Sequence, residues 1–280
     1  MATTDQYTIT GDISITKHGT RWLGGAVDDQ VQINAAGAAM ANVSYYGTLA
    51  AWIMVPDRTG TYAVLSFGDD NVVEHITMRI VAGKLEAECN DNTTVQWKFA
   101  TAANTIKPHV WHHVAVTQDG KYPKLYIDGN EMAATQTTTT AVNSWFKACA
   151  GIDAGSIGAA EMTGDTALTE EYKGYISQVA VWSSASSTAA ALTLEEIRKA
   201  MNEPTSVQPT LLHNYWKLDG DVNDDGTGAD NGTIVGDIIY ADGNEFASRF
   251  TYGCGTALVA DSVTIGAGDR LATAVLIQAA

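Results

Sequence analysis

Short strand-like runs, rich in Thr, Val, Ile and Tyr, recur along this 280-residue chain and are separated by Gly, Asn and Asp. Several alternate polar and apolar residues, which is the pattern of a strand with one buried face. The runs are Tyr7–Ile15, Gln30–Asn34, Thr48–Val55, Ala63–Phe67, His75–Val81, Lys84–Glu88, Val95–Phe99, His112–Gln118, Lys124–Ile127, Tyr175–Trp182, Leu211–Leu218 and Val263–Ile265. Such frequent short strands are typical of β-sandwiches. The sequence therefore predicts an all-β fold of antiparallel sheets.

Predicted turns separate some of these runs. Asp-Gly occurs at residues 119–120 and 128–129, and Ala-Gly at residues 82–83. These residue types adopt positive φ at low cost, so we expect hairpins there. The Thr-rich segment 135–140 is either a polar connector or an edge strand.

One segment, residues 193–202, has the features of an α-helix. Thr193 can cap its first turn, and Glu196 three residues later completes a capping box. Leu194, Ile197 and Met201 form the apolar stripe that would pack the helix on a sheet. The predicted fold is therefore a large β-sandwich with one short helix near residues 193–202.

Acidic residues outnumber basic ones: the chain has 32 Asp and Glu against 16 Lys and Arg, which gives a net charge of −16. This charge repels phosphate backbones and anionic lipids, so nucleic-acid binding is excluded as a function class. The apolar stretch Leu271–Ile277 is too short to span a bilayer, and we expect no membrane insertion. The first residues show no signal-peptide pattern, so we expect no signal peptide in the chain.

The three cysteines, Cys89, Cys149 and Cys254, lie far apart and are odd in number. This disfavours a disulfide framework, and no CxxC pattern indicates a metal site. We expect the cysteines to be small core residues.

Several consecutive segments resemble the laminin-G-like family of concanavalin A-type jelly rolls. The most similar segments are WHHVAVTQDG at residues 111–120 and LYIDG at residues 125–129. Further similar segments are AVDDQVQI at 26–33, TLAAWI at 48–53, YKGYISQVAVW at 172–182, LTLEEIRKAM at 192–201 and LHNYWKLDG at 212–220. The resemblance covers residues 26–240 and implies a two-sheet antiparallel jelly roll that permits glycan binding.

The family does not require the two ends of the chain. We therefore divide the chain into an N-terminal β-arm at residues 1–25, a jelly-roll domain at 26–245 and a C-terminal β-arm at 246–280. Exposed edges on the arms would suit strand addition to neighbouring subunits, and hence a homo-oligomeric assembly. The alternative is that the arms extend the sheets of their own monomer.

Four tryptophans, Trp52, Trp111, Trp182 and Trp216, lie in or beside strand-like runs. A jelly roll needs large side chains between its two sheets, and we expect these indoles to fill that space. A platform on which a sugar stacks is the alternative.

The sequence gives little support for catalysis. Retaining glycanases need two carboxylates about 5 Å apart, and the E-x-D-x-x-E string that supplies them in enzymes of this fold is absent. Glu86 and Glu88 share one strand face, and we interpret them as part of a solvated outer face. We therefore expect no enzymatic activity.

The adjacent residues His112 and His113 carry side chains that are good metal ligands. Neighbours on a strand point to opposite faces, however, so the pair cannot chelate one ion without a bulge. We interpret both histidines as structural.

Calcium is the cofactor that the sequence favours. Residues 221–226 read D-x-N-x-D-G, the first half of an EF-type loop, but the twelfth position is Gly232, which excludes an EF-hand. Residues 218–248 contain eight acids and no Lys or Arg. The candidate ligands of a looser calcium loop are Asp221, Asn223, Asp225 and Asp230. The alternative is a solvated acidic loop.

Two functional hypotheses fit these observations best. The first is a non-catalytic surface protein, such as a virion decoration or fibre component, that displays the sandwich for glycan or host-surface attachment. The second is a secreted calcium-dependent lectin or adhesin, and a polysaccharide lyase or hydrolase is a third hypothesis. We expect a location on a virion or extracellular surface, with neighbouring subunits and glycans as partners.

Overall fold

The computed structural model describes residues 20–23, 29–162, 164, 167–236 and 238–241. Most of the predicted N-terminal arm and all of the predicted C-terminal arm lie outside the described residues, and so do the runs Tyr7–Ile15 and Val263–Ile265 and Cys254.

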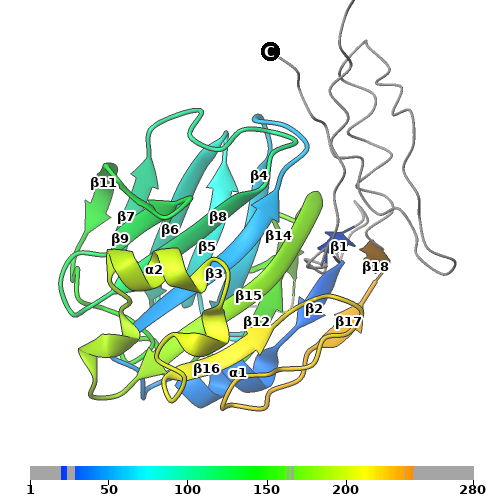
Figure 1. Ribbon diagram of the computed structural model, residues 1–280. Coiled ribbons are helices and arrows are strands. Elements are labelled where there is room, and N and C mark those ends of the chain that lie inside the picture. The colour runs from blue at the N-terminus through cyan, green and yellow to red at the C-terminus, as the bar shows by residue number, and fades with distance from the viewer. Residues whose placement is uncertain (1–19, 24–28, 163, 165–166, 237, 242–280) are drawn as a thin grey trace, which may run out of the picture. The chain divides into compact units, whose positions relative to one another are not determined.

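Two antiparallel sheets of eight strands each form a sandwich within this part of the chain, which confirms the predicted fold class (Figure 1). The strand order of the first sheet is β10-β9-β8-β3-β15-β1-β18, and β16 also pairs with β15. The order of the second sheet is β11-β7-β6-β5-β4-β12-β2-β17. A small separate sheet pairs β13 with β14.

The observed strand bounds agree best with the predicted ones where polar and apolar residues alternate without a break, as in β5, β8 and β9. The first sheet contains β1 (Thr20–Leu23), β3 (Tyr46–Met54), β8 (His112–Gln118), β9 (Lys124–Ile127), β10 (Asn130–Met132), β15 (Gly174–Ser184), β16 (Leu212–Trp216) and β18 (Ile238–Ala241). The second sheet contains β2 (Gln30–Gln32), β4 (Thr61–Gly68), β5 (His75–Val81), β6 (Lys84–Asp91), β7 (Thr94–Thr101), β11 (Ala134–Thr139), β12 (Ala154–Ile157) and β17 (Thr233–Val235). The small sheet consists of β13 (Ala160–Glu161) and β14 (Leu168–Thr169).

Two strands, β11 and β1, add to what the sequence predicts. β11 is the edge strand of the second sheet, so the Thr-rich segment is a strand rather than a connector. β1 falls within the segment predicted as an N-terminal arm and pairs with both β15 and β18.

Positive φ occurs in all three predicted hairpin turns, but at residues 119–120 only Gly120 has it, with φ of 85°. Ala82 and Gly83 have φ values of 48° and 70°, and Asp128 and Gly129 have values of 50° and 68°. Two consecutive residues with positive φ match the right-handed twist of the strands that they join.

The predicted helix is α2 (Leu194–Ala200), and its capping box is present. A second helix, α1 (Asn34–Met40), is absent from the sequence prediction, because it has no side-chain cap and no polar face that would reveal it. Its Gly37 is packed so closely on β12 that an added Cβ would lie 2.5 Å from the Ala154 oxygen. None of the described helices has the length and apolar character needed to cross a membrane.

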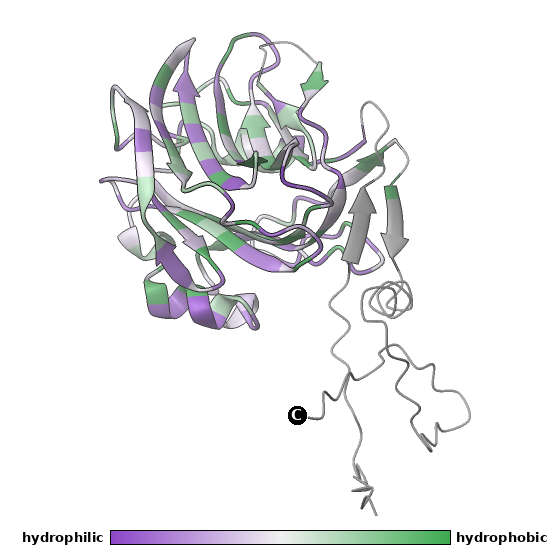
Figure 2. Cartoon of the chain, turned by 90° about the horizontal axis from the view of Figure 1, so that it is seen from above, coloured by the Kyte–Doolittle hydropathy of each residue, from purple (hydrophilic) through white to green (hydrophobic). Residues whose placement is uncertain are grey.

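The described residues form two hydrophobic cores. The main core lies between the two sheets, and hydrophilic and hydrophobic bands alternate along the strands (Figure 2). The second core lies on the outer face of the first sheet (Figure 1). There the short 3-10 helix η1 (Thr188–Ala190) packs against β3 and β15, α2 packs against β10, and the 3-10 helix η2 (Pro204–Ser206) packs against α2 and β16.

The tryptophans are distributed differently from the prediction. Trp216 belongs to the main core as expected, whereas Trp182 is buried in the second core. Trp52 and Trp111 are half-buried, because their positions in the strand alternation direct them away from the other sheet. The space between the sheets is filled instead by two other indoles, of Trp97 and Trp145, which stack with ring centroids 6.1 Å apart.

Candidate ligand-binding site

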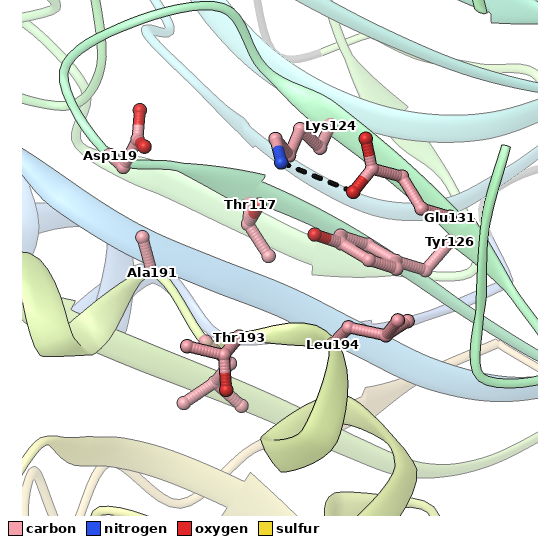
Figure 3. A pocket seen from close by; sticks show the side chains of 9 residues that line it. Thr117, Asp119, Lys124, Tyr126, Glu131, Ala191, Thr193 and Leu194 are labelled. Carbon is pink, nitrogen blue, oxygen red and sulfur yellow. Dashed lines mark hydrogen bonds and ion pairs between the residues drawn. The ribbon is translucent and has the colours of Figure 1, made fainter. Parts of the chain in front are cut away.

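A pocket of about 230 Å³ opens on the outer face of the first sheet, beside the start of α2 (Figure 3). One wall is formed by β8, β9, β10 and the turn after β8, through Thr117, Asp119, Lys124, Tyr126 and Glu131. The other wall is the segment that leads into α2, Ala191, Leu192, Thr193 and Leu194. Polar side chains therefore face a partly apolar wall across the pocket.

Strand register explains why four of the polar side chains meet. Thr117 pairs with Lys124 across β8 and β9, and Glu131 pairs with Tyr126 across β10 and β9. Paired residues on neighbouring strands share a face, and so do Lys124 and Tyr126, which are two positions apart. Leu125 between them belongs to the main core, so the register of the core directs its neighbours into the pocket.

Hydrogen bonds hold the opposite wall in place. The buried hydroxyl of Thr48 donates to the Ala190 carbonyl at 2.8 Å and accepts the Leu192 N–H at 2.9 Å. Thr193 accepts the Glu196 N–H at 3.3 Å, and the Glu196 carboxylate accepts the Thr193 N–H at 2.9 Å. The capping box that starts α2 thus also shapes the pocket.

The pocket contains an ion pair and a buried phenol. Lys124 Nζ lies 3.1 Å from Glu131 Oε2, and nearly half of each side chain is exposed. Asp119 accepts the Lys121 N–H at 3.0 Å. Tyr126, by contrast, is 2% exposed, so its ring forms the floor and its hydroxyl points toward Thr117 (Figure 3).

Burial raises the pKa of the Tyr126 hydroxyl. The hydrogen bond with Thr117 and the charge of Lys124 act in the opposite direction, while the Glu131 and Asp119 carboxylates raise the pKa further. The phenol is therefore protonated at neutral pH and can donate a hydrogen bond. The pKa of Lys124 is also raised, chiefly by its hydrogen bond with Glu131, so the ammonium remains charged.

No residue of this pocket is among the sites predicted from the sequence. Its walls come from segments far apart in the chain, and only the packing of α2 on the sheet brings them together. The signal that the sequence did contain is the strand at 124–127, where Lys124 and Tyr126 alternate with core residues.

The predicted calcium ligands lie in the connection between β16 and β17. Asp221 accepts the Asn223 N–H at 3.0 Å, and Asp225 Oδ2 lies 2.6 Å from Lys217 Nζ. Among the described residues, no three His, Cys, Asp or Glu side chains are grouped so that they could hold a metal ion. The structure thus does not assemble Asp221, Asp225 and Asp230 at one point, and calcium binding stays a prediction.

The acid that organises this loop is Asp224, which is not among the predicted ligands. Its carboxylate accepts the Tyr215 N–H at 2.7 Å, the Asn214 amide at 2.7 Å and the Asp230 N–H at 2.8 Å. The Asp230 carboxylate accepts from the same Asn214 amide at 3.1 Å. The central acids of the loop therefore have structural hydrogen bonds to β16.

The structure corrects the interpretation of Glu86 and Glu88 as solvated residues, because both are less than a tenth exposed. Arg79 Nη2 lies 2.7 Å from Glu86 and 2.9 Å from Glu88, and Lys98 Nζ lies 3.0 Å from each. Arg79 also contacts Glu170, next to β14, at 2.9 Å. These cations compensate the carboxylates on the outer face of the second sheet, which permits their burial.

The structural interpretation of the two histidines is confirmed. His112 Nε2 accepts the Lys107 N–H at 3.0 Å, so its ring proton lies on Nδ1, which faces Asp128 at 2.8 Å. His113 points to the opposite face and contacts Trp52 edge-on, with ring centroids 5.5 Å apart. The pKa of His113 is lowered to about 4, because the effect of burial outweighs the opposite effect of the Asp128 carboxylate.

A family model described as the concanavalin A-like lectin/glucanases superfamily, of the laminin G type, matches residues 23–191, more than half of the chain. The chain therefore belongs to this superfamily. No curated protein sequence is significantly similar to it.

Several solved structures share the fold. A carbohydrate-binding module (CBM40) of the Ruminococcus gnavus IT-sialidase, bound to α2,3 sialyllactose, is 15% identical with a TM-score of 0.50, over 64% of this chain and 97% of the module. A heptameric SAP-like pentraxin from Limulus polyphemus is 13% identical with a TM-score of 0.52, over 80% of this chain and 94% of the pentraxin. The leech intramolecular trans-sialidase is 15% identical with a TM-score of 0.51, over 65% of this chain and 28% of the enzyme. Likenesses at such low identity show the fold alone.

Proposed function

We propose that this protein is a non-catalytic glycan-binding protein and that the pocket beside α2 is its sugar site. The observation that carries the proposal is the composition of the pocket. Leu194, which is half-buried, offers carbon surface beside the buried side chains of Tyr126 and Leu192 at the bottom of the pocket. Lys124 and Glu131 offer hydrogen-bond donors and acceptors at one edge. A sugar ring presents the same combination of C–H faces and hydroxyl groups, and ligand sites commonly combine apolar walls with a few polar groups.

The state of the carboxylates supports a non-catalytic role. Hydrolysis of a glycoside needs one carboxyl that gives a proton and another that attacks or activates water. Glu86 and Glu88 are instead paired with Arg79 and Lys98, and Glu131 in the pocket is paired with Lys124. An assay for new reducing or unsaturated ends on neutral and anionic polysaccharides tests this part, since any turnover would revive the lyase or hydrolase hypothesis.

The carbohydrate-binding module among the structural neighbours supports glycan binding at the level of fold. One fold carries many functions, however, so the site has to support the function on its own chemistry. The apolar and polar groups of the pocket support sugar binding by their own chemistry, independently of the similarity in fold.

A glycan array with the full chain tests the proposal, together with a variant that fills the pocket. Ala191→Phe places a large ring at the wall of the pocket, and we expect it to abolish binding. Ala185→Phe, at an exposed position outside the pocket, is the matched control and should bind as the unchanged protein does. Absence of binding to every glycan, or binding that Ala191→Phe leaves intact, would contradict the proposal.

The setting that we propose for this activity is the surface of a virus particle, with the protein as a decoration or fibre component. The β-rich composition of the two ends supports this setting, because such segments suit strand addition to neighbouring subunits. We expect the full chain to be oligomeric in sizing experiments and a form trimmed to residues 19–241, which cluster as one compact unit, to be monomeric. Oligomers that survive trimming unchanged would count against a role for the ends.

A further inference from the structure

We infer that the pocket beside α2 selects neutral sugars, whose adjacent hydroxyl groups engage Lys124 and Glu131 together, and rejects sugars that carry a carboxylate, such as sialic acids and uronic acids. This inference rests on the proposed function. It goes further by naming the ligand class, and it sets the pocket apart from the sialyllactose-binding module with the same fold.

The first argument is the charge of the pocket. Two carboxylates, of Asp119 and Glu131, and one ammonium, of Lys124, are among its lining groups. The ammonium lies 3.1 Å from Glu131 and is compensated by it. The remaining charge is that of Asp119, so a ligand carboxylate would enter a site of like sign within a chain whose net charge is −16.

The electrostatic environment of Tyr126 on the pocket floor agrees with this balance. Burial, which raises the pKa of this phenol, and the hydrogen bond with Thr117, which lowers it, have the largest effects; the carboxylates of Glu131 and Asp119 then raise the pKa, while the charge of Lys124 lowers it. The negative charges of both acids are therefore felt at the pocket floor, where a ligand would bind.

The second argument is hydrogen-bond matching. An ammonium has three donors and Lys124 uses one of them on Glu131, whose carboxylate oxygens can accept further bonds. Two neighbouring hydroxyl groups can meet this pair, since one accepts from the ammonium and the other donates to the carboxylate. A ligand carboxylate only accepts, so it would give Glu131 and Asp119 no donor beyond those that they already have from Lys124 and the Lys121 N–H, and it would still displace water from both carboxylates.

The test is an array of matched pairs in which each neutral glycan is printed beside its sialylated or uronate counterpart. We expect binding to neutral members at least ten times stronger than to their anionic counterparts. Stronger binding to the anionic members would overturn the inference and leave the proposed function standing. Silence across the array would contradict both.

Two variants locate the selectivity in the pocket. Removing the negative charges with Asp119→Asn and Glu131→Gln together should reduce the preference for neutral glycans at least tenfold. Glu195→Gln removes an exposed charge outside the pocket and should leave the preference unchanged. Neutral binding with a preference that the double variant does not alter would place the selecting site elsewhere and overturn the inference.

Discussion

The Nη2 atom of Arg79 lies 2.9 Å from Oε2 of Glu88, and less than a tenth of either side chain is exposed. Burial pushes the pKa of Glu88 upward, but the hydrogen bonds from His75 and Lys98 and the charges of Arg79 and Lys98 outweigh it and lower the pKa to about 2. The negative charge of Glu88 is therefore part of what holds β5, β6 and β7 together.

Removal of this charge should destabilise the fold. For Glu88→Gln we expect the free energy of unfolding at pH 7 to fall by about 3 kcal/mol, the equivalent of the pKa shift and of a broken buried ion pair. Urea denaturation measures this difference, and Glu195→Gln on the exposed face of α2 serves as the control. A loss of less than about 1 kcal/mol, the range of exposed ion pairs, would contradict the role assigned to Glu88.

The same pair predicts a pH dependence. The folded state holds the pKa of Glu88 at about 2, below its ordinary value of 4.5, so the stabilisation is fully present above pH 4.5 and is lost as the pH falls toward 2. Between those pH values, the free energy of unfolding should therefore change more steeply with pH for the unchanged protein than for Glu88→Gln. Parallel slopes would show that Glu88 does not titrate as the geometry indicates.

Local patterns in the sequence were sufficient to predict most of the fold. β5, β8 and β9 are found at their predicted bounds because one face of each contacts the main core, so alternation is visible in the residues themselves. α2 is found because its capping box is a local signal. α1 escapes prediction because it is stabilised by contact with β12, which has no trace in its own short Ala-rich sequence.

The candidate site could not be predicted in the same way. The sequence shows that Lys124 and Tyr126 share a strand face, but not that residues 191–194 lie opposite them. Alternation predicts that Glu86 and Glu88 lie on an outer face of the sandwich, but it contains no information about the cations that cover that face. Both features depend on residues that are distant in the chain and meet only through tertiary packing, so a local sequence pattern does not reveal them.

His113 should make the fold sensitive to mild acid. Its pKa is lowered to about 4 by burial, whereas an unfolded histidine titrates near 6.5. Between these values the unfolded state binds a proton that the folded state does not, so about 3 kcal/mol of stability should be lost as the pH falls from 6.5 to 4. His113→Gln should flatten the profile in that window, and a profile that the substitution leaves unchanged would contradict the assignment.

Cys89 and Cys149 should be inert in the folded protein. Their Sγ atoms lie 3.6 Å apart and both residues are fully buried. The hydrogen bond with Cys89 and burial raise the pKa of the Cys149 thiol, which keeps the reactive thiolate scarce. In a Cys254→Ser background, a disulfide reagent should modify neither thiol in buffer and both in urea. Rapid modification in buffer would show that this part of the core opens.

Calcium binding at the loop after β16 can be tested through stability. A cation that binds only the folded state raises the melting temperature, so the sequence-based prediction requires a higher melting temperature in calcium than in chelator. Asp221→Asn should remove the difference, while Asp57→Asn, outside this loop, should leave it. Equal melting temperatures in calcium and chelator would favour the solvated acidic loop.

Thr193 connects the stability of α2 to the shape of the pocket, because it is both the N-cap of the helix and part of the pocket wall. Thr193→Ala removes the hydroxyl that accepts the Glu196 N–H, and we expect a loss of about 1 kcal/mol in the free energy of unfolding. Glycan affinity should fall as well, since the wall loses its anchor, and Thr193→Ser should restore both properties by returning a capping hydroxyl. Affinity that stays constant while stability falls would show that the capping box supports the helix without shaping the site.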